Sequence, residues 1–143
     1  MFKKLLIALT LCLLPRLVFA TQEYDTCYAQ AKDDNEVALC MKAESARVLK
    51  QLQNTYLEIS KHPQTAGWNN GNGLITGNLK DMYDHWLAYR NRYCSLFAKS
   101  SENGFGSESF HKERCLLRMT TDQYDLMHQI LINANSGAEE DHD

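Results

Sequence analysis

Three segments of the chain repeat apolar residues at the spacing of an α-helix. The first runs from about Asn35 to Ser60, and no proline or glycine interrupts it. Asp33 and the acidic residues after it are typical of a helix start, and His62-Pro63 ends the helix, since the residue before a proline is pushed out of helical geometry. Its apolar positions are Val37, Cys40, Met41, Val48, Leu49, Leu52, Tyr56 and Ile59.

The other two segments run from about Asn78 to Lys99 and from about Glu108 to Asn133. The apolar side of the second consists of Leu79, Met82, Tyr83, Trp86, Tyr89, Arg90, Tyr93 and Phe97, and that of the third of Phe110, Cys115, Leu116, Leu117, Met119, Tyr124, Met127, Ile130 and Leu131. We expect these side chains to be buried, and a short helix within residues 21–32. The pattern predicts an all-α fold, a small antiparallel bundle of three main helices plus the short N-terminal helix.

The loop between the first two long helices is rich in glycine and asparagine. Residues 64–73 read Gln-Thr-Ala-Gly-Trp-Asn-Asn-Gly-Asn-Gly, a composition that favours turns. Trp68 in its middle either anchors the loop to the core or is offered to a partner. If a partner binds this loop, Trp68, Asn69 and Asn70 are the candidate contacts.

The N-terminus has the features of a secretory signal peptide. Lys3 and Lys4 precede an apolar run, and Val18-Phe19-Ala20 offers a small-residue cleavage site. The apolar run is too short to span a membrane. Cys12 lies inside that run and not after it, so we prefer simple cleavage to lipidation. We therefore expect a signal peptide at 1–20, a helical domain at 21–133 and an acidic, disordered tail at 134–143.

Charge narrows the classes of partner. Cleavage after Ala20 would remove three of the 15 basic residues and none of the 18 acidic ones, which leaves a net charge of −6. Nucleic acids and anionic membranes attract basic surfaces, so neither is an expected partner. The negative charge favours a cationic partner, although it also fits the plainer role of keeping the protein soluble.

Four cysteines follow the predicted cleavage site: Cys27, Cys40, Cys94 and Cys115. An even number in a small exported chain indicates two disulfides and an oxidising compartment, the periplasm or the exterior. Four cysteines allow three connectivities. We favour Cys27–Cys40 and Cys94–Cys115, because the members of each pair are near each other in sequence.

Catalytic signatures are missing from the sequence. No two histidines have metal-ligand spacing, no Gly-x-Ser-x-Gly elbow occurs, and no glycine-rich phosphate loop precedes a helix. Two pairs of acids three residues apart, Asp81 with Asp84 and Asp122 with Asp125, could act in glycosidic chemistry, but exposed acidic helix faces are much commoner. We expect a protein that is not an enzyme, with no cofactor and no metal.

The stretch from Trp86 to Cys94 holds a tryptophan, two tyrosines, two arginines and a cysteine. Trp86, Tyr89 and Arg90 form its structural motif. An arginine beside aromatic residues usually lays its stem over their rings and donates to a carboxylate or to helix-end carbonyls. We favour this role for Arg90 over ligand binding.

This stretch, Trp-Leu-x-Tyr-Arg-x-x-x-Cys, resembles the central motif of the lysozyme inhibitor LprI-like family of bacterial envelope proteins. Cys27 and Cys40 resemble the first cysteine pair of that family, residues 52–56 its Leu-Asn-x-x-Tyr segment, and Cys115 with Thr120 its last cysteine and threonine. The family usually has arginine where this chain has Gln123 and often has glutamine where it has Tyr83. The loop at 64–73 looks like an insertion.

The resemblance implies an all-helical, disulfide-bonded domain, periplasmic or secreted, that binds and inhibits a lysozyme or a related cell-wall hydrolase. Lysozymes are commonly cationic and have a carboxylate-lined cleft, which suits an acidic binder. The alternative is a structural or protein-interaction module of the envelope that inhibits nothing.

Overall fold

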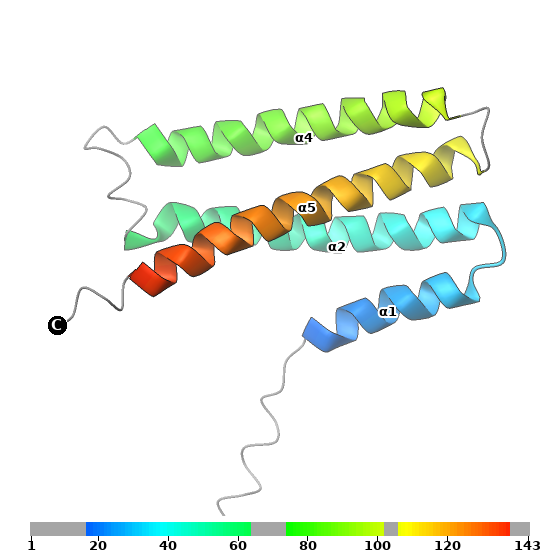
Figure 1. Cartoon of the computed structure of the whole chain (residues 1–143), viewed down its shortest axis with the longest axis horizontal. Coiled ribbons are helices and arrows are strands. Elements are labelled where there is room, and N and C mark those ends of the chain that lie inside the picture. Colours follow the sequence, from blue (N-terminus) through cyan, green and yellow to red (C-terminus); the bar gives the residue numbers. More distant parts are fainter. Residues whose placement is uncertain (1–16, 64–73, 102–105, 138–143) are drawn as a thin grey trace, which may run out of the picture.

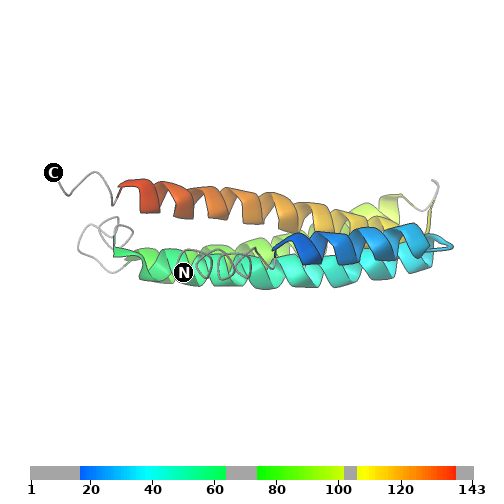
Figure 2. The ribbon, with the colours of Figure 1, turned by 90° about the horizontal axis from the view of Figure 1, so that it is seen from below.

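The computed structural model of the chain describes residues 17–63, 74–101 and 106–137, and these ranges contain helices and no strand. The helices are α1 (Leu17–Gln30), α2 (Asp34–Lys61), α4 (Leu74–Ser100) and α5 (Glu108–Gly137). Successive helices are antiparallel, and α5 packs against both α2 and α4 (Figure 1). The view in Figure 2 shows α5 following α2 along an elongated bundle, with α1 beside the first half of α2. The all-α bundle expected from the sequence is therefore confirmed.

The start of α2 shows how sequence sets a helix boundary. Asp33 Oδ1 accepts hydrogen bonds from the backbone N–H groups of Asn35 and Glu36, both at 2.9 Å. Glu36 Oε2 reaches back to accept the N–H of Lys32 at 2.8 Å. These bonds satisfy N–H groups that have no partner inside a helix, so α2 begins at Asp34, within one residue of its predicted start.

The core lies mainly between α2 and α5. Its buried cluster consists of Leu52, Tyr56 and Ile59 from α2 with Met127 and Leu131 from α5, and Leu79, Tyr83 and Trp86 of α4 pack against it. Residues three or four apart on a helix share a face, so the buried residues of α2 form one apolar stripe. This stripe packs against the stripe formed by the buried residues of α5. The apolar positions predicted for these two helices are buried or half-buried.

Both disulfides have the predicted connectivity. Cys27 of α1 pairs with Cys40 of α2, and Cys94 of α4 pairs with Cys115 of α5, with Cα–Cα distances of 5.8 and 5.5 Å. The first fastens α1 to the bundle, and the second brings the backbones of α4 and α5 close together. Among the described residues, no helix is long and apolar enough to cross a membrane.

Three helix ends differ from the prediction. α1 begins at Leu17, four residues before the range 21–32 in which we expect a short helix. α4 begins at Leu74, four residues before Asn78, so Gly77 lies in its first turn. α5 extends to Gly137, four residues beyond Asn133, because Ala134 is buried and Asn135 Oδ1 lies 2.9 Å from His62 Nε2 at the end of α2. The first residues of the predicted acidic tail are therefore helical, and 138–143 lie outside the described residues. α1 runs across the predicted cleavage site at Ala20, which stays a prediction.

Candidate functional site

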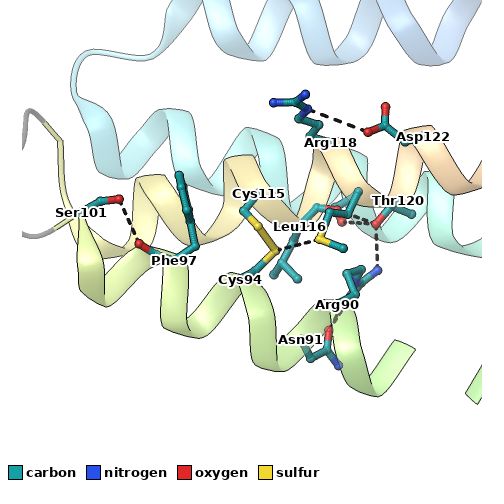
Figure 3. Close-up of a disulfide and its surroundings, with 12 residues drawn as sticks. Arg90, Asn91, Cys94, Phe97, Ser101, Cys115, Leu116, Arg118, Thr120 and Asp122 are labelled. Atoms are coloured by element: carbon teal, nitrogen blue, oxygen red, sulfur yellow. Dashed lines mark hydrogen bonds and ion pairs between the residues drawn. A yellow bond between two sulfur atoms is a disulfide. The ribbon is translucent and has the colours of Figure 1, made fainter. Parts of the chain in front are cut away.

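Arg90 lies in the contact between α4 and α5 and is only 7 % exposed. Its Nη1 donates to Thr120 Oγ1 at 2.8 Å, and Nε and Nη2 donate to Asn91 Oδ1 at 3.2 and 3.0 Å (Figure 3). The guanidinium carbon lies 5.4 Å from the centre of the Trp86 ring. Arg90 is therefore held by a threonine, an amide and an aromatic face.

This arrangement corrects one part of the prediction for Arg90. The contact with an aromatic ring is confirmed, but the expected carboxylate or helix-end carbonyl is not its partner: the structure places neutral side-chain oxygens there. Burial is the main cause that lowers the pKa of the Arg90 guanidinium from its ordinary value, and nearby Glu113 opposes that effect. The side chain joins two helices without forming an ion pair with any residue in the described ranges.

Thr120 connects this contact to α2. Its hydroxyl donates to the carbonyl of Leu116 at 2.6 Å, accepts from Arg90, and lies 3.5 Å from the hydroxyl of Ser45. Cys94 and Cys115 are bonded one turn away, and Cys94 Sγ lies 3.6 Å from Met119 Sδ (Figure 3). The arginine, cysteines and threonine that carry the family resemblance thus form one buried structural unit.

The large aromatic residues of α4 do not all belong to the core. Trp86 is half-buried, but Tyr89, Tyr93 and Phe97 are 58, 45 and 41 % exposed, so the prediction that they are buried is wrong. It is also wrong for Met82, which is 53 % exposed. Each of the three directly precedes a buried residue, respectively Arg90, Cys94 and Ala98. The small side chains of Cys94 and Ala98 let α4 approach α5 closely, which leaves no room between the helices for the larger rings.

These rings form a continuous series along the flank of α4. The centres of Tyr89 and Tyr93 are 5.7 Å apart, those of Tyr93 and Phe97 are 6.4 Å apart with nearly parallel planes, and Phe97 meets the edge of His111 on α5. Together with Arg114 and Arg118 they line a groove of about 500 Å³ between α4 and α5. We call Tyr89, Tyr93, Phe97, Arg114 and Arg118 the aromatic–arginine face.

The two arginines of this face also border a second groove, of about 740 Å³, between α5 and α1. Tyr24 and Tyr28 line it from α1, and Phe110 lines it from α5. Arg118 Nε lies 3.9 Å from Asp122 Oδ2, and both side chains are largely exposed (Figure 3). Neither arginine was predicted from the sequence as a candidate site residue. Their spacing of four residues in a predicted helix did, however, place them on one helix face.

The two departures from the family pattern lie against the same side chain. Gln123 Nε2 donates to the hydroxyl of Tyr56 at 3.0 Å, and the ring of Tyr83 meets that of Tyr56 edge-on with centres 5.1 Å apart. Tyr56 belongs to the segment that matches the family. The substitutions are therefore neighbours in the core and leave the aromatic–arginine face untouched.

The remaining candidates from the sequence are the loop contacts, the paired acids and a metal site. The candidate contacts Trp68, Asn69 and Asn70 lie outside the described residues, so the loop hypothesis stays a prediction. Asp84 forms an exposed ion pair with Lys80, and Asp81 is exposed on the same helix. Within the described ranges, no group of histidine, cysteine, aspartate or glutamate residues is placed to hold a metal ion.

Comparison with known proteins identifies a family for most of the chain. The family model described as "Lysozyme inhibitor LprI" matches residues 27–125, which include both disulfides, Arg90 and Thr120. No curated protein and no solved structure matches the chain.

Proposed function

Since the chain belongs to the LprI lysozyme inhibitor family, we propose that it binds and inhibits a lysozyme or a related cell-wall hydrolase. The observation that carries this proposal is the extent of the family match, from the first disulfide cysteine to beyond the Arg90–Thr120 contact. The family is one of inhibitors, so we propose that this chain acts by binding and not by catalysis.

Two properties of the chain support this proposal. It has 18 acidic and 15 basic residues, and predicted cleavage after Ala20 would make the balance more negative, which favours association with a cationic enzyme. Its two disulfides suit a protein that works outside the reducing cytosol, in the periplasm or beyond the cell.

A lysis assay tests the proposal. The chain from Thr21 onward, with both disulfides formed, is mixed with a suspension of peptidoglycan and a lysozyme at low salt, and turbidity is followed. We expect lysis to slow in proportion to the added protein and to stop near stoichiometric excess. The control is the same protein reduced and alkylated. Full lysis at stoichiometric excess, repeated over several types of lysozyme, would contradict the proposal.

The same assay tests the loop prediction from the sequence. If Trp68, Asn69 and Asn70 form the contact, Trp68→Ala weakens inhibition while the protein keeps its far-ultraviolet circular dichroism. Unchanged inhibition by Trp68→Ala would place the contact elsewhere on the molecule.

A further inference from the structure

The aromatic–arginine face combines the two side-chain types most typical of strong protein contacts. Tyrosine and arginine are enriched among the residues that carry most of the binding energy at interfaces. Tyr89, Tyr93 and Phe97 leave about half of their surfaces in water, although their apolar rings would be expected inside a bundle. Neighbouring rings already contact one another, which reduces the conformational freedom that they would lose on binding.

The charges of the two arginines are balanced only in part. Asp25 and Asp122 line the groove toward α1 together with them. Arg114 forms no ion pair with any residue that the structure describes, and Arg118 meets Asp122 only at 3.9 Å. Both arginines stand at the rim of the groove that the three rings line. A guanidinium offers a planar set of donors that matches a carboxylate, and an aromatic rim shields that pair from water.

The active-site cleft of a glycoside hydrolase presents the complementary chemistry. Such enzymes hold a pair of carboxyl groups on either side of the bond that they cut. A cleft that binds sugar rings also has apolar walls against which flat side chains can pack. The aromatic–arginine face of the inhibitor would then meet the acidic cleft of the enzyme. The rest of the inhibitor, which is acidic, would meet the cationic exterior of the enzyme.

We infer that the aromatic–arginine face enters the substrate cleft of the hydrolase, with Arg114 and Arg118 directed at its carboxylates and the three rings against its walls. This inference rests on the proposed function and assigns its binding surface. It places the contact on the half of the bundle where α4 ends and α5 begins (Figure 1).

Matched charge reversals test the inference. Arg114→Glu with Arg118→Glu changes the face, and Arg92→Glu with Lys99→Glu makes the same change in net charge at exposed positions of α4 that line neither groove. We expect the first pair to raise the concentration for half-inhibition at least ~30-fold and the second by less than ~3-fold, as for central and peripheral interface residues. Tyr93→Ala should weaken inhibition at least ~10-fold. Circular dichroism and thermal melting check that each variant folds.

The outcomes separate this inference from the proposed function. If the wild-type protein inhibits and both charge-reversed pairs inhibit equally well, the aromatic–arginine face is not the binding surface. The proposed function is then retained. If Trp68→Ala abolishes inhibition and Tyr93→Ala does not, the loop makes the contact and the inference is overturned. If the wild-type protein inhibits no hydrolase, both the proposed function and the proposed binding surface are contradicted.

A competition experiment tests the position of the contact on the enzyme. A chitin oligosaccharide that fills the cleft should displace the inhibitor from a lysozyme immobilised on a sensor surface. Changing the catalytic acid of that lysozyme to glutamine should weaken binding of the wild-type inhibitor and have a smaller effect on the Arg114→Glu, Arg118→Glu variant. Simultaneous binding of oligosaccharide and inhibitor would refute entry into the cleft.

Discussion

Arg90 carries its charge into the contact between α4 and α5, where three hydrogen bonds to neutral oxygens and the face of Trp86 replace water. A buried polar group that loses its partners costs more than the hydrogen bonds themselves contribute. Thr120 depends on Arg90 in the same way, since its hydroxyl accepts from the guanidinium while it donates to Leu116. The sequence indicated an aromatic partner for Arg90, because Trp86 lies one turn away. The family resemblance singled out Thr120, but nothing in the sequence indicated that it pairs with Arg90, 30 residues away.

We expect Arg90→Ala to lower the free energy of unfolding by about 2–4 kcal/mol, because it removes the guanidinium over the Trp86 ring and leaves Thr120 with one fewer partner. Arg92→Ala, at an exposed position of the same helix, should change it by less than about 0.5 kcal/mol. Urea denaturation followed by circular dichroism measures both. Equal stability of the two variants would show that the Arg90 contacts contribute nothing to the fold.

At the scale of elements, the helices and their covalent links could be predicted because they depend on residues near in sequence. Helical spacing, the Asp33 cap and the proximity of the cysteines each act within about 20 residues. Which face of α4 is buried depends instead on α5. Arg90, Cys94 and Ala98 repeat at the same spacing as Tyr89, Tyr93 and Phe97, so periodicity alone cannot choose between stripes that differ by one residue, about 100° of rotation.

Removing each disulfide should have a different effect on the structure. In residues 22–30 of α1 most side chains are exposed, and the helix packs mainly on α2, so Cys27–Cys40 supplies much of its attachment. Replacing this pair with serine should free α1 for proteolysis and leave the main unfolding transition in place. Replacing Cys94 and Cys115 removes a link that closes 21 residues and should destabilise the whole bundle by about 3 kcal/mol.

Limited proteolysis and urea denaturation of both serine pairs distinguish these effects. The prediction is wrong if α1 stays resistant to protease without Cys27–Cys40, or if both pairs shift the main transition equally.

For the whole molecule, net charge and local charge have opposite signs. The chain is acidic as a whole, with a formal net charge of −3, yet Arg114 and Arg118 stand together between two aromatic grooves. Composition could predict the first property and not the second, because the grooves combine residues of α1, α4 and α5. In the inhibitor that we propose, the overall charge would guide encounter and the local charge would act after contact.

Association with a cationic lysozyme should therefore slow as ionic strength rises. Increasing the salt concentration from about 10 to 150 mM shortens the Debye length from about 30 to 8 Å, so we expect the association rate to fall by roughly tenfold or more. The dissociation rate should change much less, because the contacts of the aromatic–arginine face exclude water. Stopped-flow fluorescence or surface binding at several salt concentrations measures both rates. An association rate independent of salt would contradict steering by net charge.

The pairing of the cysteines also bears on how the chain is made. From Cys27 onward, the four cysteines pair consecutively, the first with the second and the third with the fourth, at sequence separations of 13 and 21. An oxidase that meets the chain from its N-terminus finds Cys27 and Cys40 before Cys94 has emerged, so joining thiols in order of arrival yields the native links. Maturation of this protein would then require an oxidant but no isomerase to correct its disulfides.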